Sequence, residues 1–194
     1  MKNKIQEILS SSVAVKQQVL QDEAILDTIE KVTAVIVACF KNNGTVLLCG
    51  NGGSAADAQH LAAEFSGRFY KDRAPLNAEA LHVNTSYLTA VGNDYSFDEI
   101  YSRLVKAKGK QGDVLLALST SGNSKNIVEA AKTAKERGMT VVSFTGASGG
   151  KLKEVSDYLI NIPSTDTPRI QECHITVGHI ICQLVEEKYF SDKS

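Results

Sequence analysis

The sequence has no excess of charge of either sign, because its net charge is −1 over 194 residues and positive and negative side chains are interspersed. It therefore lacks the basic footprint of a nucleic-acid or membrane-surface binder, although a protein partner is not excluded. No apolar run reaches about 18 residues, the length that a membrane-spanning helix needs. Residues 1–9 mix charges with apolar side chains, unlike the continuous apolar centre of a signal peptide. We expect a cytoplasmic protein that binds neither nucleic acid nor a membrane.

The cysteines show no Cys-x-x-Cys pair and no zinc-finger spacing. Most of them lie inside apolar runs, which indicates small buried side chains in a reducing compartment rather than disulfides or a thiolate metal site. The four are Cys39, Cys49, Cys173 and Cys182.

The chain also lacks internal repeats, low-complexity segments and linkers. Its 43% hydrophobic and 22% charged residues are ordinary for a globular protein, and a chain of this length buries roughly 70% of its unfolded surface. We expect one domain over residues 1–194, made of leading helices in 1–43 and an α/β core in 44–194.

Two amphipathic helices are predicted before the first strand. The first is marked by Ile5, Ile8, Leu9, Val19 and Leu20. The second runs from Ile25 to Phe40, opened by Asp22 and closed at Asn43-Gly44. Their apolar stripes either cover the sheet or pack against another copy of the protein.

Strand and helix patterns alternate from residue 45 onward. Apolar runs predict buried strands at 46–49, 80–83, 114–118, 140–145 and 158–162. Helical patterns lie at about 54–67, 86–108, 123–137 and 150–155, and a last helix runs from about Pro168 to Tyr189. This alternation predicts an α/β fold with a doubly wound, mainly parallel five-stranded sheet flanked by helices.

A glycine-rich turn joins the first strand to the next helix, at residues 50–54. Gly50, Gly52 and Gly53 let backbone amides converge on one point, and the start of the helix adds its own free amides. This arrangement favours the binding of an anion. Ser54 is either a hydroxyl donor there or the N-cap, with Asp57 in a capping-box position. A purely connecting turn is the alternative.

A second polar turn, Ser119-Thr120-Ser121-Gly122-Asn123-Ser124, follows the third strand. Hydroxyls and a glycine before a helix N-terminus are typical of a phosphate cradle, and a serine-rich cap loop is the alternative. Because ligands of open α/β sheets bind outside the carboxyl ends of the strands, the two turns are expected to face one crevice.

His60 and Glu64 are four residues apart, on one face of one predicted helix. This is a common spacing for metal ligands, and an exposed pair on an amphipathic helix is the alternative.

These features, together with Val91-Gly92-Asn93-Asp94 and the ending Arg169-Ile170-Gln171-Glu172-x-His174, resemble the sugar isomerase (SIS) family over nearly the whole chain. The combination with His60, Glu64, Gln171 and His179 is similar to the narrower phosphoheptose isomerase group. The resemblance implies an aldose–ketose isomerase that converts sedoheptulose 7-phosphate to D-glycero-D-manno-heptose 7-phosphate through an enediol, for bacterial heptose and lipopolysaccharide precursors.

The resemblance also implies roles for individual residues. Glu64 matches the general base and His179 the general acid, and zinc is implied between His60, Glu64, Gln171 and His179. Substrate and phosphate contacts are implied for Asn51, Gly52, Gly53, Ser54, Arg68, Asn93, Asp94, Ser119, Thr120, Ser121, Ser124 and Gln171.

Gln171 and His179 are eight residues apart, which is about 12 Å of helix rise. Either the last helix begins late, near Gln171, or the ligands belong to sites shared between chains. We favour shared sites in a homo-oligomer, and the resemblance suggests a tetramer.

Two other functions compete with this one. The first is a non-catalytic SIS adaptor that binds the replication initiator, but such a relative lacks the residues that match Glu64 and His179. The second is an isomerase of another sugar phosphate, such as arabinose 5-phosphate. Of the remaining histidines, His174 is as readily a packing residue as a site residue, and His82 is expected in the core or an interface.

Overall fold

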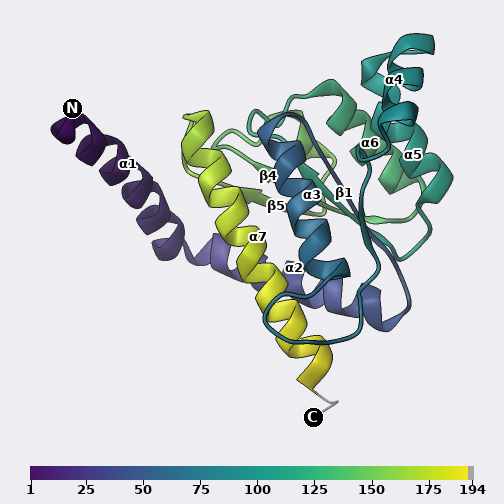
Figure 1. The fold of residues 1–194 in the computed structure, drawn as a ribbon, viewed down its shortest axis with the longest axis horizontal. Coiled ribbons are helices and arrows are strands. Elements are labelled where there is room, and N and C mark those ends of the chain that lie inside the picture. Colours follow the sequence, from purple (N-terminus) through teal and green to yellow (C-terminus); the bar gives the residue numbers. More distant parts are fainter. Residues whose placement is uncertain (192–194) are drawn as a thin grey trace.

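The central sheet has five parallel strands in the order β2-β1-β3-β4-β5. The computed structural model describes residues 1–191 (Figure 1). The strands are β1 (Val46–Gly50), β2 (Ala78–Ala80), β3 (Val114–Leu118), β4 (Thr140–Thr145) and β5 (Tyr158–Asn161). The α-helices are α1 (Lys2–Gln21), α2 (Glu23–Lys41), α3 (Gly53–Ser66), α4 (Thr85–Asp94), α5 (Ile100–Lys108), α6 (Lys125–Glu136) and α7 (Thr167–Phe190), with 3₁₀ turns η1 (Phe97–Glu99) and η2 (Gly150–Glu154). The predicted doubly wound parallel sheet is confirmed.

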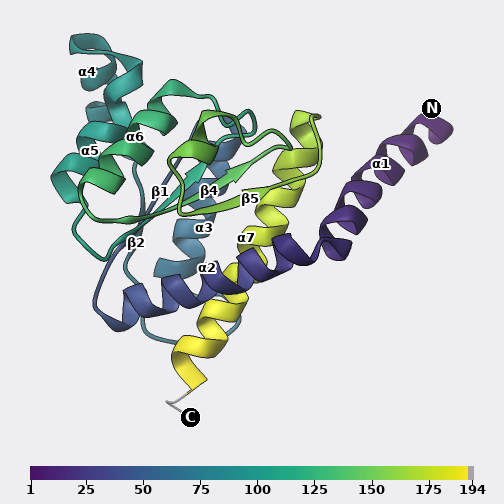
Figure 2. The same ribbon diagram turned by 180° about the vertical axis from the view of Figure 1, so that it is seen from behind.

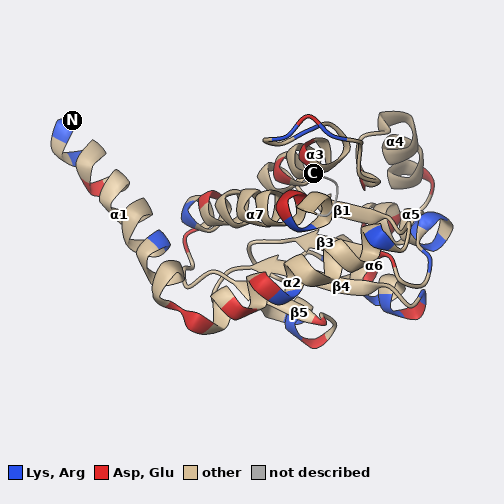
Figure 3. Ribbon diagram, turned by 90° about the horizontal axis from the view of Figure 1, so that it is seen from below, with Lys and Arg blue, Asp and Glu red and all other residues tan. Residues whose placement is uncertain are grey.

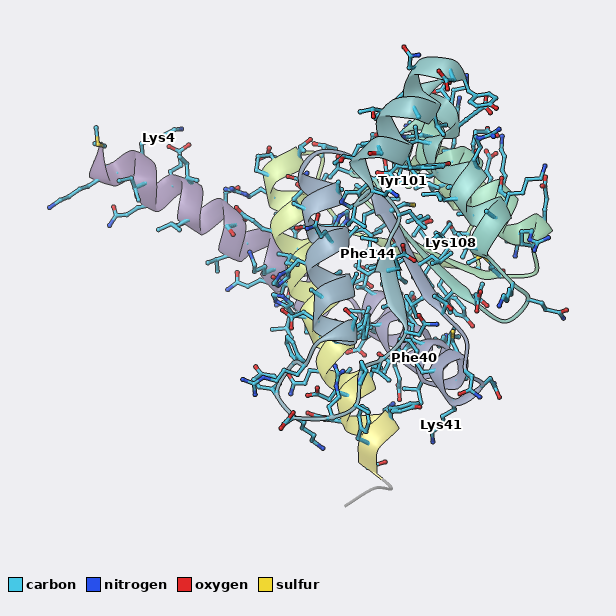
Figure 4. The ribbon with its side chains drawn as sticks, turned by 45° about the vertical axis from the view of Figure 1, so that its right-hand side comes forward. Lys4, Phe40, Lys41, Tyr101, Lys108 and Phe144 are labelled. Atoms are coloured by element: carbon cyan, nitrogen blue, oxygen red, sulfur yellow. The ribbon has the colours of Figure 1, made fainter. Side chains whose placement is uncertain are left out.

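Two hydrophobic cores lie on opposite faces of this sheet. Successive strand side chains point to opposite faces, so Leu48 and Leu116 enter one core while Leu47 and Leu115 enter the other. Helices α2, α3 and α7 cover the first face, and α5 and α6 cover the second (Figures 1 and 2). Figure 4 labels Phe144 of the first core. All four cysteines are buried and free, as expected.

The two leading helices have different roles. Asp22 is the N-cap of α2, because its carboxylate accepts the amides of Ala24 and Ile25, and α2 packs its apolar face on the sheet. Helix α1 has no fully buried residue: Val15 and Val19 pack against the first core, and its N-terminal end projects away from the domain (Figures 1 and 2). Lys4, near its free end, is exposed (Figure 4). Of the two alternatives for the apolar stripes, covering the sheet therefore applies to α2 alone.

The second strand and the following helix differ from the prediction. The strand is 78–80 rather than 80–83, because after Leu81 donates to the carbonyl of Leu48 the chain turns, and Asn84 caps α4. The helix predicted over 86–108 is interrupted, because the hydroxyl of Ser96 accepts the amide of Asp98 and starts η1. The segment 150–155 is a 3₁₀ turn rather than an α-helix, entered through Gly149 and Gly150 at positive φ.

Acidic and basic residues are interspersed over the helices and loops (Figure 3). Within residues 1–191, no helix is both long and apolar enough to cross a membrane.

Candidate active site

Helices α3 and α7 run side by side in the same direction and bring three predicted site residues together (Figure 1). Nε2 of His60 lies 2.9 Å from Nε2 of His179 and 3.2 Å from Oε1 of Glu64. One ligand atom from each residue lies within 4.8 Å of the other two. His60 and Glu64 share a face of α3 through their four-residue spacing, and His179 faces them from α7.

A glycine on α7 allows this close approach. A Cβ at Gly178 would lie 2.6 Å from Cδ1 of Leu61, which is one residue from His60. Because Gly178 has no side chain, the helices approach where the histidines meet. Further along, Gly53 of α3 lies against the side chain of Gln171 of α7, so the two helices stay paired over several turns.

The environment favours an uncharged His179. Burial lowers the pKa of His179, nearby His60 lowers it further, and the Glu64 carboxylate opposes both. A neutral imidazole is the form that binds metals. Two imidazoles and a carboxylate that leave a fourth position open are a donor set typical of catalytic zinc. The residues present therefore fit a divalent metal ion.

Gln171 lies apart from these three residues. Helix α7 begins at Thr167, so Gln171 is already helical and lies about 12 Å along the axis from His179. A late helix start is therefore wrong. Its amide lies at the N-terminal end of α3, where a Cβ on Gly53 would meet Nε2 at 2.7 Å. One chain gathers three of the four predicted ligands.

The glycine turn begins α3 without the predicted capping box. Gly52, at φ +56°, is the N-cap, so Ser54 already lies inside the first turn and no side chain caps the helix. Ser54 is buried, with 3% of its surface exposed. Among the described residues, Oδ2 of Asp57 is buried without a hydrogen-bond partner, and burial raises the pKa of Asp57 although His60 opposes this.

The serine loop is folded tightly at the end of β3. Ser119 donates its hydroxyl to Ser124 at 3.1 Å, and the amide of Gly122 donates to the carbonyl of Ser119. Ser124 is the N-cap of α6, yet its hydroxyl does not accept an amide of that helix. The hydroxyl of Ser124 therefore does not cap α6. Thr120 and Ser121 line a pocket of about 280 Å³ together with Ser148, Ser164, Thr165 and Thr167.

A reciprocal amide pair joins the two turns. Asn51 donates to Asn126 at 2.8 Å, and Asn126 donates back at 2.9 Å. Strands β1 and β3 are neighbours, so both turns leave the same edge of the sheet. Behind them, the Tyr101 hydroxyl, labelled in Figure 4, donates to the carbonyl of Gly50. The two turns therefore leave the same edge of the sheet, as the sequence predicts.

Three predicted substrate contacts are exposed in the single chain. Arg68 is exposed just beyond α3. Asn93 and Asp94 are exposed at the end of α4, where Asn93 donates to Asp94 at 2.9 Å. Helix α4 packs on α5 and η1 rather than on α3 or α7.

His174 is a packing residue. It is fully buried, its Nε2 lies 3.1 Å from the carbonyl of Thr145, and its ring meets Phe144 edge-on. Burial lowers the pKa of His174 to about 4, and the Thr145 hydrogen bond acts in the opposite direction. His82 is partly buried in the loop after β2, and burial lowers its pKa.

A buried ion pair close to the cluster was not predicted. Arg73 and Glu186 are 2.9 Å apart, with 4% and 2% of their side chains exposed. The sequence does carry one indication of this ion pair: Glu186 lies on the apolar stripe of the last helix, after Ile181, Cys182 and Val185. Burial acts to raise the pKa of Glu186, but backbone amides and Arg73 lower it overall.

Comparison with known proteins gives consistent matches over the chain. Residues 9–146 match the SIS domain family model. The phosphoheptose isomerase of Clostridium acetobutylicum is 50% identical over 193 residues, covering 100% of this chain and 98% of that protein. The structure of phosphoheptose isomerase from Neisseria gonorrhoeae has a TM-score of 0.90 at 42% identity, covering 96% of this chain and 98% of that one. The structure of a phosphoheptose isomerase from Francisella tularensis has a TM-score of 0.91 at 36% identity, with 95% and 97% covered.

Proposed function

The chain belongs to the SIS-domain family and, within it, to the phosphoheptose isomerases, and we propose that it interconverts sedoheptulose 7-phosphate and D-glycero-D-manno-heptose 7-phosphate. The product would supply bacterial heptose and lipopolysaccharide precursors. The observation that carries this proposal is the His60–Glu64–His179 cluster in a protein that also has a hydroxyl-rich loop at the end of β3. On the full-length match we also propose a single SIS domain over residues 1–194.

The reaction moves one proton between neighbouring carbons. Glu64 removes a proton from C1 of the ketose, which gives a 1,2-enediol, and the proton returns to C2. His179, held neutral by its surroundings, exchanges protons with the oxygens on C1 and C2. Ser119, Thr120, Ser121 and Ser124 hold the phosphate, while Asn51 and residues 52–54 shape the sugar end of the crevice. Both retained acid–base residues favour an enzyme over a non-catalytic adaptor.

Zinc is the metal that we propose for the cluster. His60, Glu64 and His179 would hold it, and it would supply polarisation of the sugar carbonyl. Metal analysis of protein prepared without chelator should find zinc, and removal by chelator should lower turnover. Full activity without any metal would make the cluster a hydrogen-bonding site.

The active form that we propose is a homo-oligomer, a tetramer, with shared sites. Exposed apolar side chains lie along α1, and an apolar pocket of about 210 Å³ lies between α1, α2 and α7. A second copy would cover them and bring Gln171, Arg68, Asn93 and Asp94 to a neighbouring cluster. The exposed apolar residues of α1 are Ile5, Ile8, Leu9, Val13 and Leu20.

Shared sites are testable by subunit mixing. Glu64→Gln and Gln171→Ala chains, each inactive alone, should regain part of the activity after subunit exchange, because a mixed pair contains one intact site. Sedimentation should show an oligomer that α1 truncation dissociates. No regained activity in demonstrably mixed oligomers would refute the sharing.

The function itself is tested with a panel of sugar phosphates. Sedoheptulose 7-phosphate should give an aldoheptose phosphate, detected by nuclear magnetic resonance. Turnover of arabinose 5-phosphate instead would overturn the substrate, and no turnover of any sugar phosphate would favour the adaptor.

A further inference from the structure

Glu186, near the C-terminal end of α7, holds the loop that follows α3. Its carboxylate accepts three successive backbone amides, from Phe69 at 3.2 Å and from Tyr70 and Lys71 at 2.9 Å each. It also accepts Nε of Arg73 at 2.9 Å. We call residues 67–75, which lead away from α3 and contact α7, the strap (Figure 1).

Arg73, in the strap, holds the C-terminal end of α3. Its Nη2 donates to the carbonyl of Glu64 at 2.8 Å. Its Nη1 donates to the carbonyls of Phe65 at 2.7 Å and Gly67 at 3.0 Å. The last carbonyls of a helix lack partners within the helix, so the guanidinium satisfies them and fixes the turn that carries Glu64.

The strap also reaches His179. The ring of Phe69 lies 5.7 Å from the ring of His179, centroid to centroid, and packs edge-on against Tyr70 at 4.7 Å. The strap therefore contacts two residues of the cluster: the backbone of Glu64 and the ring of His179.

We propose that Arg73 and Glu186 are positioning residues for the His60–Glu64–His179 cluster, acting through the backbone of Glu64 and through Phe69. A buried ion pair contributes little net stability compared with well-packed apolar side chains. Here, however, the two side chains together bind several backbone groups around one acid–base cluster. The proposal rests on the proposed function in taking this cluster as the reacting centre.

Glu186→Gln removes the charge at nearly constant shape. Loss of such a supporting group around metal ligands typically lowers metal affinity or activity about 10- to 100-fold. We expect kcat to fall by that factor and zinc affinity to fall about 10-fold, while KM for the sugar phosphate stays near that of the wild type because the phosphate loop at 119–124 is untouched. Arg73→Lys should act in the same direction, since an ammonium cannot bind these carbonyls as a planar fork does.

Two controls separate positioning from general destabilisation. Glu79→Gln removes an exposed ion pair with Lys108 on the opposite face of the sheet from α3 and α7, and should leave kcat and zinc affinity unchanged. Val105→Ala opens a cavity in the opposite core and lowers stability without touching the strap. Melting temperatures are measured for all variants, and assays are run well below them.

The outcomes are distinct. A fall in kcat and zinc affinity in both strap variants, absent from Val105→Ala, supports the proposal. Wild-type kcat and zinc affinity in the folded strap variants, or an equal loss in Val105→Ala, overturns it. If the wild type isomerises no sugar phosphate, the proposed function fails, while weaker zinc binding in Glu186→Gln still supports positioning of the cluster.

Discussion

The close contact between α3 and α7 at Gly178 predicts a measurable penalty for a single methyl group. In Gly178→Ala the new Cβ would lie 2.6 Å and 2.7 Å from the two methyl groups of Leu61, whereas ordinary contacts begin at 3.4 Å. Leu61 is itself 1% exposed, so it has little room to turn away. Either Leu61 leaves its rotamer or the helices separate by roughly 0.8 Å.

Overpacking of this kind destabilises a core by about 1–3 kcal/mol. For a protein of this size each kcal/mol lowers the melting temperature by about 2–4 °C, so circular dichroism should show a fall of roughly 2–12 °C. Because Leu61 and Gly178 adjoin His60 and His179, the same separation loosens the cluster. A displacement near 1 Å reduces turnover by up to about 100-fold.

A compensating variant tests whether the contact between Leu61 and residue 178 causes the loss. Leu61→Val in the Gly178→Ala background removes a methylene from the crowded contact and should recover much of the melting temperature and kcat. A Gly178→Ala protein that melts and turns over like the wild type would refute this account of the helix contact. So would a double variant worse than both single variants.

Three further predictions concern single side chains. Glu64→Gln should reduce kcat about 10²- to 10⁴-fold, the usual contribution of a general base, while phosphate protection of the protein in thermal shift persists; an unchanged rate would remove Glu64 as the base. Burial holds the pKa of His174 at about 4, below the unfolded value of about 6.5. The neutral, buried imidazole therefore contributes its full stability above about pH 6.5. As the pH falls toward 4, the free energy of unfolding should decrease by up to about 3 kcal/mol. Urea unfolding at several pH values should show this loss, and a folded His174→Gln protein with the same pH dependence would contradict it. Asn51→Ala leaves the buried amide of Asn126 unpaired and should lower the free energy of unfolding by about 1–3 kcal/mol, whereas an unchanged urea midpoint would mean that the pair contributes nothing.

Periodicity and caps predicted most of the fold because they act locally. Asp22 before an apolar stripe starts α2, and the apolar run after Asp113 forms β3 where expected. The errors arose where a short polar group decided the outcome. Ser96 breaks a helical pattern through one hydrogen bond, and the turn after Leu81 ends a strand that its apolar residues would have continued.

The site was predictable only in part for a different reason. His60 and Glu64 share a helix, so their spacing already placed them together. The pairing of His60 with His179, 119 positions apart, depends on Gly178 and on the direction of α7, which no local pattern carries. The contacts of the strap were not predictable for the same reason, because Glu186 binds amides more than a hundred residues before it in the sequence.

The reciprocal amide pair between Asn51 and Asn126 affects the binding of a ligand at the two turns. It ties the turn after β1 to the first turn of α6, so the two sides that we propose for the sugar and for the phosphate are preorganised relative to each other. A ligand that touches both sides then loses less conformational entropy of the protein on binding than it would with two independent loops. The two halves of a sugar phosphate should therefore bind with an advantage over inorganic phosphate and free sugar supplied separately.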